Sequence, residues 1–202
     1  KGYDLFGSAI IKILNKFTNW SAVVVGDEPR EKLIFKHKRL NILGFQNHSK
    51  VLKIFSSASI AVVCSRWEEP FGRTSLEASS RGCAVIISNR GGLPETITNG
   101  IIIRNLTVQN IYNAIKRLII SSKYRVKFQK LSLKNFYLTN SFAAKKIDKY
   151  RNSLLPTQKL KLNFFKEKNK LKILHVTNFN ERHNGRLFYN TGRRINNGFI
   201  RL

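Results

Sequence analysis

Residues 59–95 read SIAVVCSRWEEPFGRTSLEASSRGCAVIISNRGGLPE, and their order of strand, loop, helix and strand decides the fold. The apolar, β-branched run at 59–63 is typical of a strand buried on both faces, and a similar run follows at 84–88. Pro70 and Gly72 mark a loop after the first of these strands. Two buried strands joined through a helix indicate an α/β fold with a parallel sheet.

The loop and helix between these strands contain a candidate anion site. From Arg73 the sequence predicts a helix, which Gly82 closes. The first turn of such a helix lies at the carboxyl edge of the sheet, where its unpaired amides offer donors to a phosphate. Glu77 follows Arg73 and Thr74 by about one turn, so its carboxylate is predicted on the same face, within reach of the hydroxyls of a ribose. Glu69, in the loop, can accept hydrogen bonds from a sugar.

A purely structural interpretation of these residues is the alternative. Glutamates near a helix start commonly pair with the helix dipole or face solvent, and a glycine after a helix is commonly only a cap. The complete string favours a ligand-binding site over a purely structural role. Gly91 and Gly92 follow the second strand and let the backbone approach a ligand closely. The pattern therefore predicts a site for a nucleotide-diphospho-sugar.

These residues also carry a resemblance to a known family. EPFGRTSLE at 69–77 and GGLPE at 91–95 resemble the donor-binding signature of the retaining glycosyltransferases of the GT-B fold, family 4. Other segments resemble the same C-terminal domain of that family, namely KGYD at 1–4, SAVVVGDEP at 21–29, LNILGF at 40–45 and the Asn99-Gly100 turn. The resemblance covers about residues 1–155 and implies a Rossmann-like parallel sheet with flanking helices, one half of a GT-B fold.

The resemblance implies a role for each matching residue. Lys1 would pair with the diphosphate, Glu77 would hold the ribose, and Glu69 would be the catalytic carboxylate that holds a hydroxyl of the donor sugar. The remaining contacts come from the backbone at Phe71 and Gly72 for the sugar, Arg73 and Thr74 for the phosphates, and Phe45 for the base. The Arg73 side chain either adds charge beside the phosphates or points into solvent. No metal and no cofactor are expected, because fixed amides and Lys1 can offset the charge of the leaving diphosphate.

Length and composition fit a soluble enzyme domain. The 202 residues are 42% hydrophobic and contain no apolar run long enough for a transmembrane segment. Cys64, which stands where the family usually has proline, and Cys83 lie at the edges of predicted strands, which indicates reduced core thiols in a cytoplasmic protein. The chain has no methionine and begins inside a domain motif, so we expect a fragment that lacks an upstream acceptor domain. Such a fragment would bind the donor but turn it over poorly or not at all; a non-catalytic sugar-nucleotide-binding module is the alternative.

The net charge of +26 introduces another function class, nucleic-acid binding. Between residues 112 and 172, however, 17 Lys and Arg stand against two acids, so 15 of the excess charges lie away from the motif. Helices predicted at 107–121, 122–137 and 139–154 place these charges between apolar positions, as solvated faces do. No RRM, KH or zinc-ligand pattern appears, and no nucleic-acid partner is expected. Solubility and attraction to an anionic membrane that carries a lipid-linked acceptor both remain open.

The organisation of the chain changes after the last predicted helix. Residues 1–155 are interpreted as the nucleotide-sugar-binding domain, and the basic, aperiodic stretch 156–170 as a linker. The run LKILHVTNF then predicts a new strand, so residues 171–202 resemble the truncated first β-loop-α unit of a second Rossmann-like domain. Arg186 either contacts an anion in that unit or belongs to an ordinary turn.

Overall fold

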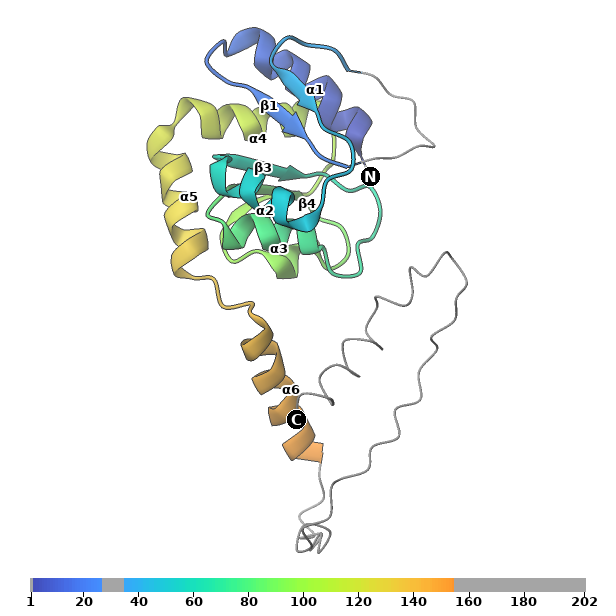
Figure 1. The fold of residues 1–202 in the computed structure, drawn as a ribbon, viewed down its shortest axis with the longest axis vertical. Coiled ribbons are helices and arrows are strands. Elements are labelled where there is room, and N and C mark those ends of the chain that lie inside the picture. Colours follow the sequence, from blue (N-terminus) through green and yellow to red (C-terminus); the bar gives the residue numbers. More distant parts are fainter. Residues whose placement is uncertain (1, 27–34, 155–202) are drawn as a thin grey trace, which may run out of the picture. The chain divides into compact units, whose positions relative to one another are not determined.

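The structure is a computed structural model that describes residues 2–26 and 35–154 (Figure 1). Lys1, the predicted linker and the predicted second unit at 171–202 lie outside the described residues.

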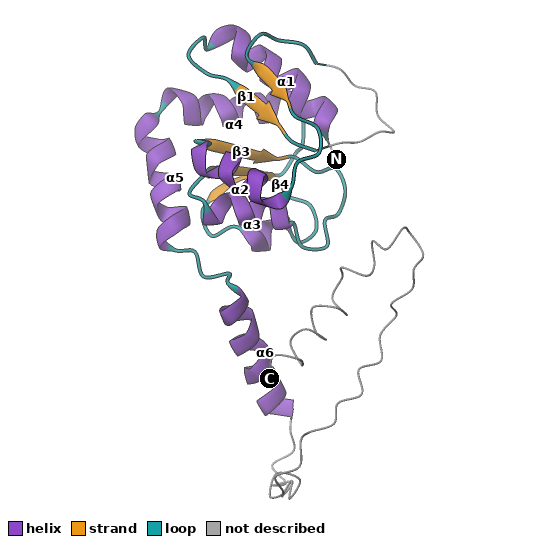
Figure 2. Ribbon diagram, viewed as in Figure 1, coloured by secondary structure: helices purple, strands orange, loops and turns teal. Residues whose placement is uncertain are grey.

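The strands form two parallel sheets, which confirms the predicted α/β fold (Figure 2). In the smaller sheet, β1 (Ala22–Val24) pairs with β2 (Leu40–Ile42). The larger sheet has the order β3-β4-β5, with β3 (Ile60–Val63), β4 (Ala84–Ser88) and β5 (Gly100–Ile103). Because all pairs are parallel, the strands of each sheet present their carboxyl ends at one edge.

Helices connect the strands and follow the last of them. Those before the last strand are α1 (Tyr3–Lys16), α2 (His48–Ser57), α3 (Arg73–Ser80) and the 3₁₀ turn η1 (Leu93–Thr96). Those after it are α4 (Val108–Ile120), α5 (Ser122–Lys134) and α6 (Asn140–Leu154). α5 ends earlier than predicted because Asn135 caps it, with its backbone amide donating to Leu131 O at 2.9 Å and its side-chain amide to Asn99 Oδ1 at 2.8 Å.

The alternation of β4 explains why helices cover both faces of the larger sheet. Ala84 and Ile86 pack in one core cluster with residues of α1 and α4. Val85 and Ile87 pack in a second cluster that includes Ala78 of α3. All residues of β4 are buried, and full burial of one large aliphatic side chain contributes roughly 1.5–3 kcal/mol. This arrangement fixes the carboxyl edge of β3 and β4 relative to the helices (Figure 1).

A close backbone contact places the start of α1 at the same edge. Gly2 has φ +82°, and a Cβ built on it would lie 1.9 Å from the carbonyl oxygen of Cys64, which directly follows β3. Only glycine fits this position. The residues that begin α1 and the loop that leaves β3 are therefore neighbours. None of the helices in the described ranges is long and apolar enough to cross a membrane.

Candidate functional site

The loop between β3 and α3 is held by a buried serine pair. Ser88, the last residue of β4, donates a hydrogen bond through Oγ to Ser65 O at 2.7 Å. Ser65 in turn donates through its own Oγ to Glu69 Oε1 at 3.0 Å and accepts from the Trp67 amide at 3.1 Å. Glu69, for which the family resemblance implies the catalytic role, is therefore linked through Ser65 to the ends of both strands.

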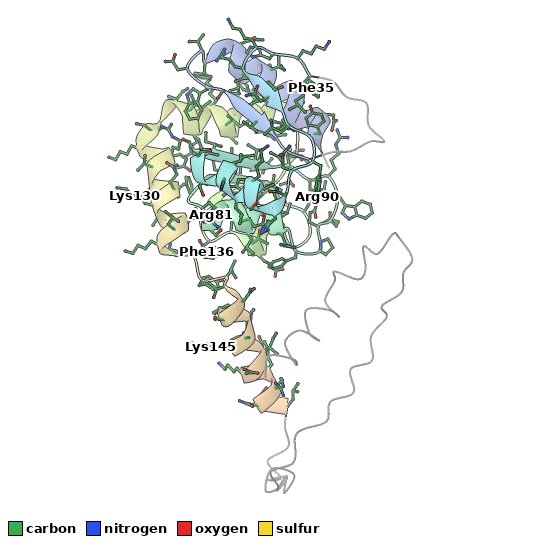
Figure 3. All side chains as sticks on the ribbon, in the orientation of Figure 1. Phe35, Arg81, Arg90, Lys130, Phe136 and Lys145 are labelled. Carbon is green, nitrogen blue, oxygen red and sulfur yellow. The ribbon has the colours of Figure 1, made fainter. Side chains whose placement is uncertain are left out.

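The double glycine holds the other side of this loop. The Gly92 amide donates to Glu69 O at 2.7 Å, and the Glu68 carboxylate accepts from the Gly91 amide and from Arg90 Nη1 at 3.1 Å. A Cβ on Gly91 would lie 2.3 Å from Glu69 O. The sequence predicted that these glycines let the backbone approach a ligand; in the structure their close neighbour is the loop backbone that carries Glu69. Figure 3 labels Arg90 on this part of the molecule.

α3 begins with open amide donors. Its N-cap is Gly72, in the left-handed conformation with φ +84°, and no side chain caps it. Within the described ranges, neither the Arg73 nor the Thr74 amide finds an acceptor. Below them, Ser75 Oγ donates to Gly72 O at 2.8 Å and lies 2.5 Å from Thr96 Oγ1 of η1. The helix start thus has two N–H groups without an acceptor among the described residues, which suits an anion.

Glu77 lies one turn further along α3 and receives two donors on one oxygen. Arg73 Nη2 lies 3.3 Å and His48 Nε2 lies 3.1 Å from Glu77 Oε1. The Glu77 side chain is 19% exposed, whereas that of Arg73 is 67% exposed. Arg73 therefore reaches back to Glu77 with its guanidinium, an arrangement intermediate between the two alternatives that the sequence left open.

His48 is a site residue that sequence reasoning missed. It begins α2, which follows β2, and its partner Glu77 stands 29 residues later. The available signal was its position just after the carboxyl end of a parallel strand, the edge at which α/β sheets place their sites. The contact also brings the segment after β2 up to α3. Phe45, in that same segment, is 81% exposed.

The structure thus brings most of the predicted residues together. Glu69, Phe71, Gly72, Arg73, Thr74 and Glu77 occupy one loop and helix start, and Phe45 precedes the His48 contact. Lys1 lies outside the described residues, although its neighbour Gly2 rests on Cys64. Both cysteines are free and buried, and burial raises the pKa of each thiol to about 11. Protonated at neutral pH, they are the core residues that the sequence predicted.

Comparison with known proteins identifies the family. A family model described as glycosyl transferases group 1 matches residues 1–134. The chain belongs to the group 1 glycosyl transferases. The matched segment, residues 1–134, includes the loop between β3 and α3, the start of α3 and His48.

Individual relatives agree with this assignment. The chain is 32% identical over 109 residues to the lipopolysaccharide core biosynthesis mannosyltransferase LpcC of Rhizobium leguminosarum bv. viciae, covering 50% of this chain and 31% of that protein. It is 32% identical over 97 residues to spore coat protein SA of Bacillus subtilis (strain 168), covering 46% of this chain and 26% of that protein. The chain therefore spans about a quarter to a third of the length of these relatives.

A solved structure shows the same fold. The C-terminal domain of a glycosyl transferase group 1 family protein, LpcC from Francisella tularensis, superimposes with a TM-score of 0.59 and 28% identity. The match covers 73% of this group 1 chain and 80% of that domain. The chain thus has the Rossmann-like α/β fold of this C-terminal glycosyl transferase domain.

Proposed function

We propose that this chain binds a nucleotide-diphospho-sugar and serves the transfer of the sugar to an acceptor with retention of anomeric configuration. One observation carries the proposal: α3 begins with the open amides of Arg73 and Thr74, Glu69 stands in the loop that leads into this helix, and Glu77 stands one turn further along it. Amides favour a diphosphate, and carboxylates favour the hydroxyl-rich groups on either side of it.

Each residue then has a defined task. The amides of Arg73 and Thr74 bind the phosphates together with Lys1, and Glu77 accepts from the ribose. Glu69 accepts from a sugar hydroxyl, the Phe71 and Gly72 amides contact the same sugar, and the backbone beside Phe45 faces the base. The name of the relative from Rhizobium, a mannosyltransferase, supports a hexose as the transferred group.

The reaction exchanges one glycosidic bond for another. The bond from C1 of the sugar to the diphosphate oxygen breaks and a bond from C1 to the acceptor oxygen forms. The departing diphosphate keeps the electron pair of the broken bond, takes the proton of the acceptor hydroxyl and leaves as the nucleoside diphosphate. The chain's part is to stabilise the departing diphosphate by fixed N–H dipoles and the Lys1 ammonium, which we propose replace a metal ion. The acceptor is proposed to be a glycan or a lipid-linked molecule at the cytoplasmic face of a membrane.

Calorimetric titration with UDP-, GDP- and ADP-sugars, with and without EDTA, tests the proposal. We expect one nucleotide class to bind, EDTA to change nothing, and Glu77→Gln to weaken binding at least tenfold, because a charge-assisted hydrogen bond contributes about 1.5–3 kcal/mol. Glu69→Gln should leave binding of the free nucleotide diphosphate intact while weakening binding of the nucleotide sugar. Binding of none of the three classes by a folded chain would contradict the donor site.

Two alternatives give different results in simple assays. A sugar-nucleotide-binding module without catalysis predicts the same titrations but no transfer when acceptor extracts are supplied. A nucleic-acid-binding protein predicts tight oligonucleotide association with a steep salt dependence that Glu77→Gln leaves unchanged.

A further inference from the structure

The two oxygens of Glu77 have different surroundings. His48 Nε2, at 3.1 Å, and Arg73 Nη2, at 3.3 Å, both lie next to Oε1. A carboxylate only accepts hydrogen bonds, so both nitrogens are the donors. No donor within residues 2–26 and 35–154 pairs with Oε2. Among the described residues, His48 and Arg73 occupy one oxygen of this carboxylate, and the lone pairs of the other are available to a ligand.

The His48 donor stands at the start of α2, whose two ends make defined contacts. The side chain of Asn47 caps α2 by accepting from the Lys50 amide at 2.9 Å, which sets the first turn on which His48 stands. At the other end of α2, Cys83 Sγ donates to Phe55 O at 3.2 Å. The first turn of α2 is thus capped locally, the last turn contacts Cys83, and His48 approaches α3 from this helix.

We infer that His48 is a positioning residue that, with Arg73, orients Glu77 so that Oε2 faces the ribose of a nucleotide. The inference rests on the proposed function. A glutamate side chain has several rotatable bonds, and a carboxylate held in its bound rotamer loses less conformational freedom when the ligand arrives. The side chains of Arg73 and His48 are 67% and 60% exposed, so exposure does not distinguish them. Arg73 stands on the same helix as Glu77, whereas His48 reaches across from α2 and ties Glu77 to a second element.

The test compares variants that keep or remove the N–H group. His48→Leu removes the donor, and His48→Gln retains an amide N–H of similar reach. Lys50→Leu changes an exposed residue two positions further along the same helix and is the matched control. Affinities of the full 202-residue chain are measured for UDP, GDP and ADP and for their 2′,3′-dideoxy counterparts, with circular dichroism as a check on folding.

For the nucleotide that binds the wild-type chain, His48→Leu should weaken affinity about threefold to tenfold, the effect of one hydrogen bond. His48→Gln should restore it to within about twofold, and Lys50→Leu should leave it unchanged. The loss should disappear for the dideoxy nucleotide and in a Glu77→Gln background, because His48 acts through Glu77 on the ribose hydroxyls.

Other outcomes overturn the inference in distinguishable ways. If the wild-type chain binds a nucleotide and His48→Leu binds it equally well, His48 does not orient Glu77. The proposed donor site would be unaffected by that result. An undiminished loss in the Glu77→Gln background, or equal losses for His48→Gln and His48→Leu, would assign His48 a direct or merely structural role. If the folded wild-type chain binds none of the nucleotides, the proposed function fails and the inference fails with it.

Discussion

Gly91 shows how a missing side chain positions a carboxylate on a neighbouring loop. The backbone around Glu68 and Glu69 occupies the space where a Cβ of Gly91 would lie, with Glu69 O only 2.3 Å from that point. Gly44 has a similar left-handed backbone, φ +60° against +53° for Gly91, but nothing lies within 4 Å of its Cβ position. A side chain at either glycine would strain the backbone, but only at Gly91 would it also clash with the loop. Comparing the two positions therefore isolates the effect of the clash.

We therefore expect Gly91→Ala to be more destabilising than Gly44→Ala. A left-handed conformation costs an alanine roughly 1–2 kcal/mol at either site. At Gly91, the clash adds about 1–3 kcal/mol to the loss of unfolding free energy and displaces Glu69. Urea unfolding followed by circular dichroism measures both variants. Equal losses in the two would mean that the loop yields freely to the added methyl group.

For single residues, the sequence predicted the loop and helix on which site residues lie better than it predicted their hydrogen-bond partners. The spacing of EPFGRTSLE placed Glu69 and Glu77 on one loop and helix, since such positions depend on local geometry. The bonds of Glu68 to Gly91 and of His48 to Glu77 join residues 23 and 29 positions apart, and no local pattern encodes them. Arg73 was left open for the same reason, because its orientation depends on whether Glu77 is free to receive it.

Arg39 joins the end of α1 to the smaller sheet through hydrogen bonds from its guanidinium. Its guanidinium donates to the carbonyl oxygens of Phe17 at 2.8 Å and of Trp20 at 2.6 Å, and also to those of Leu14 and Thr18. Several of these carbonyls lie at the C-terminal end of α1, where they have no partner within the helix. A single side chain on the way into β2 thus satisfies the end of one element and anchors the next.

Replacing Arg39 by lysine should be destabilising although the charge is kept. A lysine ammonium is a single point donor and cannot reproduce the planar fork that reaches four carbonyls. We expect Arg39→Lys to lower the free energy of unfolding by about 1 kcal/mol, because the carbonyl oxygens that lose their donor are partly buried or exposed. Thermal unfolding measures the difference, with Lys38→Ala, at an exposed neighbouring position, as the control. A loss no larger than that of the control would show that water replaces the guanidinium.

Elements were more predictable than their contacts. The predicted bounds agree within a few residues for the strands at 60–63 and 84–88 and for the helices that start at 73, 108, 122 and 140. These elements are predictable because the spacing of buried residues is a property of the local sequence. The division of the parallel strands into two sheets depends on the packing of several elements together, and no local pattern indicates it.

At the scale of the molecule, the positive charge is organised on helices rather than around the site. α5 has four exposed lysines at helical spacing, Lys123, Lys127, Lys130 and Lys134. Residues three or four apart share one face of a helix, so these side chains form a stripe, which we call the α5 lysine stripe. Figure 3 labels Lys130 on the outer side of α5. An aligned row of ammonium groups suits a surface of many negative charges better than a single anion.

We predict that the α5 lysine stripe supports salt-sensitive binding to anionic membranes. Each lysine near such a surface contributes about 1 kcal/mol, so changing all four to glutamine should weaken sedimentation with phosphatidylglycerol vesicles at least tenfold. The matched control changes four exposed lysines elsewhere to glutamine, at positions 12, 16, 36 and 38. Nucleotide titrations should be the same for both variants, because neither set touches the site. Equal vesicle binding by the two would mean that total charge, and not the stripe, attracts the membrane.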